Sequence, residues 1–195
     1  MAYGSRVNLS VSAHYAIPHE FTKYSMEKKE GNRWAYFVNV ASCSVVKVDV
    51  LTGEHKLLKR EIVMDVGESL NPAIDIGQIE GAYVQGYGYL AMEETLFSKE
   101  GKLLTRGHDT YSAPTIRDIP SVFNVALLRK QTPVENRRVL YSSKGVGEPP
   151  FLSGASVFFA IKTAVIAARA DRGSEGVCKL ATPATTRNVV QAIHL

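Results

Sequence analysis

The segment 71–94 constrains the fold more than any other part of this sequence. Asn71-Pro72 can open a helix, because proline is tolerated in the first turn, where its missing N–H is not needed. Apolar side chains then recur every three or four residues and share one helical face: Ile76, Ile79, Tyr83, Tyr87 and Leu90. We therefore predict a helix over 72–94 that must bury this face against another layer of structure.

Glycine is unusually frequent in the same predicted helix, although each glycine costs about 1 kcal/mol relative to alanine in a helix interior. The glycines are Gly77, Gly81, Gly86 and Gly88. Gly77, Gly81 and Gly88 fall on one ridge with Gln85, and such a ridge lets another backbone or a flat ligand approach closely. Spacing alone favours close helix packing over a ligand site. Gln78 and Gln85 could present amides to a polar ligand or simply be solvated.

The flanking segments carry strand patterns. Residues 35–50 are rich in β-branched and aromatic types, residues 51–54 supply a turn, and residues 56–64 read as a returning strand, which predicts a β-hairpin. We predict further strands at 122–128 and 138–142, joined by a polar connection at 130–137.

Two more helices and a long loop complete the expected elements. Residues 105–120 are polar and contain two prolines, which predicts a loop. Residues 153–169 have apolar side chains in helical register, and Thr182-Pro183 can serve as the N-cap and first-turn pair of a closing helix through Ile193. The fold class that follows is α+β, with β-hairpins and a mixed sheet packed with glycine-rich and apolar helices.

Composition indicates a folded chain and excludes several classes. A chain of 195 residues with 45% apolar and 22% charged residues can bury one good core, so neither disorder nor a fibrous repeat is expected. The net charge of +4 comes from interspersed basic and acidic residues, which argues against a nucleic-acid partner. The five histidines show no metal-ligand spacing, so we expect no metal site built from protein ligands.

We expect a cytoplasmic protein that does not enter a membrane. Cys43 and Cys178 lie far apart without a C-x-x-C pair, which is typical of a reducing compartment. The N-terminus lacks the apolar core of a signal peptide. The most apolar run, 155–168, is interrupted by Lys162 and falls short of the ~20 residues that cross a bilayer, which predicts a core helix.

The loop 144–150, with the sequence KGVGEPP, is the second unusual feature. Gly145 and Gly147 remove side-chain bulk where a large ligand could touch backbone, and Pro149 favours an extended conformation for Glu148. A helix that begins within a few residues would favour the ionised carboxylate through its positive end, whereas burial would disfavour it, and two opposed effects of this kind suit a general base. On spacing alone, an ordinary glycine–proline turn with an exposed glutamate remains the favoured interpretation.

Three segments together resemble the xanthine dehydrogenase and aldehyde oxidase family of molybdenum hydroxylases. They are NPAIDIGQIEGAYVQG at 71–86, KGVGEPP at 144–150 and SVFFAIK at 156–162. The resemblance runs from about residue 6 to residue 185, nearly the whole chain.

The resemblance implies an oxidoreductase that uses a molybdenum–molybdopterin cofactor and takes oxygen from water. The expected substrate is a small molecule: a purine such as xanthine or hypoxanthine, an aldehyde, or an N-heterocycle. The resemblance implies that Glu148 is the catalytic base, that Gln78 contacts the pterin, and that Val146 and Gly147 lie beside the molybdenum. The cofactor would carry out the redox step, and the protein would supply position and proton transfer.

Members of that family are several times longer. They carry 2Fe-2S domains, an FAD domain and the first part of the molybdenum domain upstream, and they form homodimers. The resemblance thus implies that residues 1–195 are an incomplete, C-terminal part of the molybdopterin-binding domain. It would share the cofactor with the missing upstream segments and be inactive alone. The alternative is a truncated, non-catalytic module that binds a partner or another subunit of the family.

Overall fold

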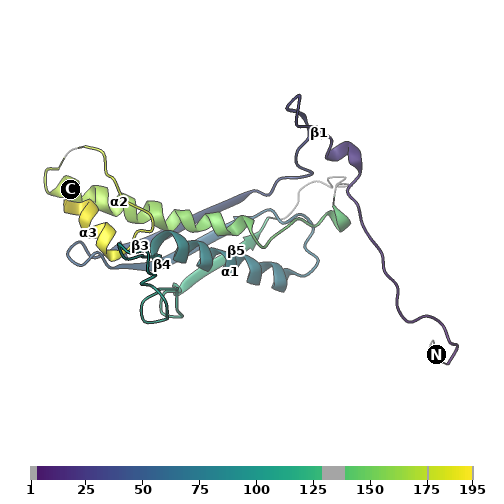
Figure 1. Ribbon diagram of the computed structural model, residues 1–195, viewed down its shortest axis with the longest axis horizontal. Coiled ribbons are helices and arrows are strands. Elements are labelled where there is room, and N and C mark those ends of the chain that lie inside the picture. The colour runs from purple at the N-terminus through teal and green to yellow at the C-terminus, as the bar shows by residue number, and fades with distance from the viewer. Residues whose placement is uncertain (1–3, 129–138, 175, 195) are drawn as a thin grey trace.

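A computed structural model describes residues 4–128, 139–174 and 176–194. Figure 1 shows an elongated body formed by a sheet and two long helices, with an N-terminal arm that extends away from it. In chain order the elements are η1 His19–Phe21, β1 Tyr24–Ser25, β2 Glu30–Gly31, β3 Val40–Val48, β4 His55–Met64, α1 Pro72–Ala91, β5 Val122–Leu127, η2 Leu140–Ser142, η3 Pro149–Gly154, α2 Ala155–Asp171 and α3 Thr186–His194.

The main sheet is mixed, as expected. β3 and β4 form the predicted hairpin and are antiparallel, whereas β5 lies parallel to β4, so the strand order is β3-β4-β5. The turn between β3 and β4 is closed by the Asp49 carboxylate, which accepts hydrogen bonds from the amides of Leu51 at 2.8 Å and Thr52 at 3.0 Å. Gly53 follows at a φ of +75°, a conformation that favours glycine.

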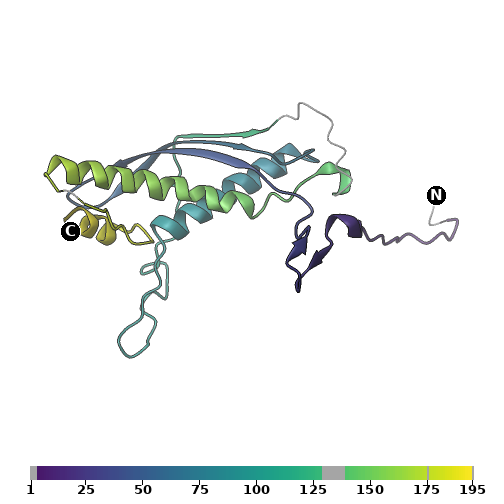
Figure 2. The same ribbon diagram turned by 90° about the horizontal axis from the view of Figure 1, so that it is seen from above.

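The fold has two layers, and α1 and α2 lie on the same face of the sheet (Figure 2). The strands alternate accordingly: every second residue of β3 is exposed, from Ala41 to Lys47. The core lies between the sheet and the helices, where Ile62, Met64 and Val66 meet the apolar faces of α1 and α2. The predicted α+β class is confirmed.

Helix α1 begins where the sequence predicts and buries the predicted face. Asn71 is the N-cap, and its side-chain oxygen accepts a hydrogen bond from the amide of Ala73 at 3.2 Å. Ile79 and Tyr83 are fully buried and Tyr87 is 2% exposed. The helix ends at Ala91, earlier than expected, because the amides of both Met92 and Glu93 donate to the Gly88 carbonyl, at 2.9 and 2.8 Å.

The glycines of α1 lie in two kinds of surroundings, close contact and open space. Gly86 faces η3 so closely that a Cβ built on it would lie 2.9 Å from the Phe151 carbonyl carbon, and one built on Gly154 would lie 2.6 Å from the Tyr87 amide nitrogen. Gly77 and Gly81 face open space, with no atom within 4 Å of such a Cβ. Close packing therefore explains Gly86, which lies off the predicted ridge, and Gly88, which lies on it and would place a Cβ 2.6 Å from Pro114 Cδ. Packing does not explain Gly77 and Gly81.

The predicted core helix is α2, and it packs as a core helix on one side. Val157, Ile161 and Val165 are fully buried. The helical segment Pro149–Asp171, which includes η3, is nevertheless long and apolar enough to cross a membrane by length and composition. The expectation that this run is too short was wrong, because η3 continues directly into α2 and adds a turn of apolar residues. Leu152, Phe159 and Ile166 remain exposed on its outer side.

Two local predictions were wrong. The strand expected at 138–142 is instead the short helix η2, because Tyr141 and Ser142 have positive φ values of 50° and 61°, which break an extended ladder. Thr182-Pro183 does not cap the closing helix: α3 begins at Thr186, and the Thr185 hydroxyl accepts a hydrogen bond from the amide of Asn188 at 3.5 Å. The connection predicted at 130–137 lies outside the described residues.

The contact between α1 and η3 predicts opposite effects for two glycine substitutions. Gly154→Ala should lower the free energy of unfolding by about 1–3 kcal/mol, because the added methyl group collides with backbone that cannot move away. The matched control is Gly81→Ala, which meets open space inside a helix and should raise stability by up to about 1 kcal/mol. Urea unfolding followed by circular dichroism measures both. Equal effects of the two substitutions would contradict the assignment.

Candidate functional site

The two sequence features meet in the structure. A Cβ built on Gly147 would lie 3.6 Å from the side-chain nitrogen of Gln78, so the KGVGEPP loop lies directly beside the beginning of α1. Gly147, Glu148 and Gln78 are all exposed. Val146 is half-buried and packs against the hydrophobic core, which fixes the loop from beneath. The four residues singled out from the sequence therefore form one open site.

A hollow of about 500 Å³ lies next to Glu148. Its lining residues are Gln85, Gly147, Glu148, Phe151 and Leu152. The Phe151 ring packs against that of Tyr89 at a centroid distance of 5.7 Å, which holds the apolar wall of the hollow. A carboxylate and an amide at the rim of an apolar hollow can orient a small polar molecule and exchange a proton with it.

The N-terminal side of the loop is held by a charged contact. Lys144 Nζ donates to the Asp65 carboxylate at 2.6 Å and to the Phe37 carbonyl at 3.0 Å. The next residue is held as well, since the amide of Gly145 donates to the Tyr36 hydroxyl at 3.0 Å. Both Lys144 and Asp65 are largely shielded from water, so this anchor is stronger than a surface ion pair.

The C-terminal side of the loop is held by a buried arginine. Arg60 Nη2 donates to Ser153 Oγ at 3.3 Å, and Ser153 Oγ donates to the Pro150 carbonyl at 2.5 Å. The guanidinium lies 3.3 Å from the centroid of the Tyr83 ring, a cation–π contact. Arg60 is fully buried, and burial lowers its pKa to about 9. Among the described residues, its Nε and Nη1 have no hydrogen-bond partner.

The backbone of Glu148 is not extended, contrary to the expectation from Pro149. Glu148 has φ −95° and ψ −37° and is the N-cap of η3. The amide of Phe151 donates to the Glu148 carbonyl at 3.0 Å, and this hydrogen bond closes the first turn of η3. The bond and the close packing of η3 on α1 offset the steric preference of a residue before proline. The expected helix start beside Glu148 is present.

The exposed side of α1 lies open next to this site. Gly77 and Gly81 have nothing within 4 Å of where a side chain would begin, and both are exposed, as is Gln85. The exposed ridge of Gly77 and Gly81 therefore lies between the side-chain amides of Gln78 and Gln85, and Gln78 lies next to Gly147. That surface can receive a flat, polar group without displacing any side chain.

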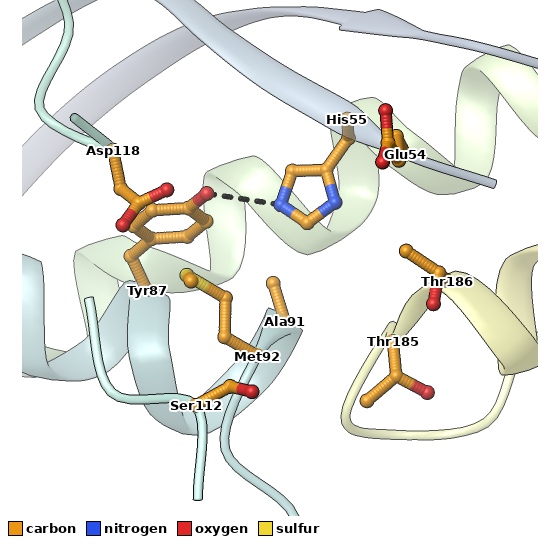
Figure 3. A pocket seen from close by; sticks show the side chains of 9 residues that line it. All are labelled: Glu54, His55, Tyr87, Ala91, Met92, Ser112, Asp118, Thr185 and Thr186. Carbon is orange, nitrogen blue, oxygen red and sulfur yellow. Dashed lines mark hydrogen bonds between the residues drawn. The ribbon is translucent and has the colours of Figure 1, made fainter. Parts of the chain in front are cut away.

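A second hollow, of about 360 Å³, lies between β4, the end of α1 and the start of α3 (Figure 3). His55 Nε2 and the Tyr87 hydroxyl form a hydrogen bond of 3.0 Å there. Burial lowers the pKa of His55, an effect that the nearby Asp118 partly offsets, and burial also raises the pKa of Tyr87. Among the described residues, no three His, Cys, Asp or Glu side chains lie close enough to hold a metal ion.

Comparison with known proteins identifies the class. Residues 1–120 match the family model described as the molybdopterin cofactor-binding domain. That match covers more than half of the chain, and the chain belongs to this family.

Curated relatives narrow the family further. The chain is 49% identical over 193 residues to xanthine dehydrogenase/oxidase of Rattus norvegicus, a match that covers 98% of this chain and 14% of the rat protein. It is 52% identical over 166 residues to aldehyde oxidase 1 of Macaca fascicularis, covering 85% of this chain and 12% of that protein. The resemblance to xanthine dehydrogenases and aldehyde oxidases is confirmed, and the chain spans about one seventh of the length of the rat relative.

Solved structures agree with this assignment. Quinoline 2-oxidoreductase from Pseudomonas putida 86 matches 77% of this chain and 18% of its own, with 26% identity and a TM-score of 0.65. The aldehyde oxidoreductase from Desulfovibrio desulfuricans matches 85% of this chain and 16% of its own, with 25% identity and a TM-score of 0.61. The fold is that of a region within such enzymes.

Several residues of the site were not singled out from the sequence. Phe151 and Leu152 line the hollow because η3 turns them toward it. Gln85, by contrast, was already a candidate amide from the sequence, and the structure places it in the lining of the hollow. No sequence pattern indicates that Arg60 and Lys144 anchor the loop, because their hydrogen-bond partners are distant in the chain.

The anchor at Lys144 leads to a test of how the loop is held. Lys144→Met should lower the free energy of unfolding by about 1–3 kcal/mol, because the shielded Asp65 carboxylate loses its cation. Amide hydrogen exchange at Gly145 should also become faster. The matched control is Lys59→Met, which breaks an exposed pair with Glu61 and should change stability by less than about 0.5 kcal/mol. Unchanged exchange at Gly145 would show that Lys144 does not hold the loop.

The lowered pKa of His55 makes the stability of the chain depend on pH. The unfolded chain gains a proton at His55 near pH 6.5, whereas the folded chain resists it, so stability falls as the pH drops below about 6.5. The slope should reach at most about 1.4 kcal/mol per pH unit. His55→Gln should flatten this part of the stability profile, and His108→Gln, at an exposed histidine, should not. Urea unfolding between about pH 5 and about pH 7.5, a range that spans the ordinary histidine pKa of about 6.5, measures the difference.

Proposed function

We propose that this chain is the C-terminal part of the molybdopterin-binding domain of a molybdenum hydroxylase, and that Glu148 is the general base of its reaction. The observation that carries the proposal is the meeting of Gln78 with Gly147, which brings together two motifs far apart in the sequence. Glu148 follows at the rim of a hollow large enough for a small molecule.

The residues present fit the cofactor that the family binds. The open surface beside Gly77 and Gly81 accepts a flat group, and the exposed amide of Gln78 can donate to and accept from the polar edge of a pterin. Because Gly147 has no side chain, the loop backbone can lie close to the cofactor. Val146 packs against the core and holds that backbone in place. We assign Gln78, Val146 and Gly147 to cofactor binding. Molybdenum–molybdopterin, when bound, supplies the oxidation–reduction chemistry.

Glu148 acts through its carboxylate in this proposal. A carboxylate Oε atom accepts the proton that an activated water loses as oxygen is transferred to the substrate. Two anchors keep the loop from drifting: Lys144 on Asp65 before it, and Ser153 with Arg60 after it. Fixed geometry of this kind is what proton transfer requires, because a displacement of about 1 Å can cost a hundredfold in rate.

The substrate is a small molecule with an electron-poor carbon. The names of the relatives include xanthine dehydrogenases and an aldehyde oxidase, so a purine and an aldehyde are both candidates, and an N-heterocycle is a third. Phe151 and Leu152 give the hollow an apolar wall that suits the flat face of any of these.

The remaining parts of the enzyme would come from other segments. We propose that these supply the rest of the cofactor site, together with 2Fe-2S and FAD groups that carry electrons onward, in a homodimer located in the cytosol. The exposed position of Gln78, Gly147 and Glu148 supports a site completed from outside this chain. The chain alone is inactive in this proposal. The alternative, a non-catalytic binding module, gains no support from an open site that retains its glutamate.

The test replaces the matching 193 residues of the rat relative with this chain. The hybrid should bind about one molybdenum atom per subunit and oxidise xanthine or an aldehyde, whereas the isolated chain should bind little molybdenum. Glu148→Ala in the hybrid should keep the molybdenum and lower kcat by about 10²–10⁴-fold.

The control for this test is Glu100→Ala, which removes an exposed glutamate from the turn after Ser98, away from the hollow. Its kcat should stay within about twofold of the parent hybrid. Near-normal turnover in Glu148→Ala would rule out its role as the base. A loss of molybdenum in that variant would instead assign Glu148 to holding the cofactor.

A further inference from the structure

The N-terminal arm carries a strand pattern that nothing in the body of the protein uses. In residues 6–12 apolar and polar types alternate, so Val7, Leu9 and Val11 point to one side of an extended chain. These side chains are 58%, 68% and 97% exposed, respectively. The opposite side carries Asn8, Ser10 and Ser12. A strand with one apolar and one polar face is typical of a sheet that is buried on one side only.

The backbone of the arm also pairs with no other described element of the chain. Within the described parts of the chain, residues 7–12 form no backbone–backbone hydrogen bond, and the Asn8 side chain accepts the only bonds to this stretch, from the Ser10 amide at 3.0 Å and hydroxyl at 3.2 Å. The arm runs away from the body in both views (Figures 1 and 2). A row of amide and carbonyl groups, of which only the Ser10 amide is bonded among the described residues, lies next to an apolar stripe and matches what the edge of a sheet binds.

We propose that residues 7–12 form a β-strand that adds to the edge of a sheet in the remaining part of the molybdopterin-binding domain. This inference rests on the proposed function, because it takes the partner to be another segment of the same enzyme. The partner sheet is identified by its chemistry: a free edge, and an apolar face on the side where Val7, Leu9 and Val11 would lie.

The match to relatives favours this partner over a second copy of the chain. The match to the family model, over residues 1–120, includes the arm, so the arm is part of the domain. The rat relative matches 98% of this chain but has most of its own length outside the match, since the match covers only 14% of it. A large amount of polypeptide is therefore available to receive the strand in an enzyme of that kind.

The first experiment is amide hydrogen exchange on the full chain alone, at two protein concentrations. The amides of Val7, Leu9 and Val11 should exchange at the rate of an unstructured peptide at both concentrations, because their partner is absent. Protection in the monomer would mean that the arm folds back on its own sheet. Protection that grows with concentration would mean that a second copy is the partner. Either result overturns the proposal.

The second experiment uses the hybrid with the rat enzyme and reads the yield of folded protein and the exchange of the arm. Leu9→Lys should lower the yield at least about tenfold, because it buries an unpaired charge between sheet and core. The matched control is Ser10→Lys, which puts the same charge on the polar face and should stay within about twofold. In the unsubstituted hybrid, the alternate amides of residues 7–11 that face the partner strand should be protected.

These readouts separate the two proposals. Glu148→Ala tests the chemistry and leaves folding intact, whereas Leu9→Lys tests assembly and is read without turnover. Equal yields for Leu9→Lys and Ser10→Lys would overturn the strand, even if the hybrid is fully active. Failure of the unsubstituted hybrid to assemble would remove the partner that the proposal names and would overturn it too.

Discussion

The close contact between α1 and η3 is the constraint on which the rest of the structure depends. Gly86 and Gly154 face each other with no room for a methyl group on either, so the backbones of the two elements touch. Because η3 begins immediately after Glu148, this contact sets where the KGVGEPP loop can lie relative to α1. Gln78 lies further toward the N-terminus of the same helix and therefore meets Gly147. A single tight contact in the core thus places the residues of the open site.

The site combines a loop that is anchored from within the fold with a surface that is open to solvent. Shielded groups hold the loop from both ends: the half-buried pair Lys144 and Asp65 before it, and the buried pair Arg60 and Ser153 after it. The residues that face outward, Glu148 among them, are exposed. Anchored inner residues and exposed outer residues suit one half of a shared site. In the proposed enzyme, this chain holds its side chains in position, and another segment closes the cavity. Arg60 is the unusual member, because its fully buried guanidinium forms no ion pair with a carboxylate of the described residues, which is costly, and it lies instead on the face of the Tyr83 ring.

Sequence reasoning succeeded where local periodicity decides the structure and failed where a neighbour in space decides it. The apolar face of α1 and the β3–β4 hairpin followed from spacing and turn chemistry. The backbone of Glu148 did not, because packing on α1 outweighs the preference of a residue before proline. The N-cap at Thr182 also failed: Asn188 Nδ2 donates to the Pro183 carbonyl at 2.8 Å, and the helix begins after that contact.

The sequence by itself determined the family, the helix that presents Gln78 and the loop that presents Glu148, because short motifs and their periodicity encode local shape and its chemistry. Only the tertiary structure decided that these two elements touch, that Gly86 rather than Gly81 makes the close contact, and that Arg60 lies buried behind the loop. The physical reason is that each of these facts depends on groups brought together by chain folding across long sequence separations. No local pattern records which of two glycines will face a neighbour and which will face open space.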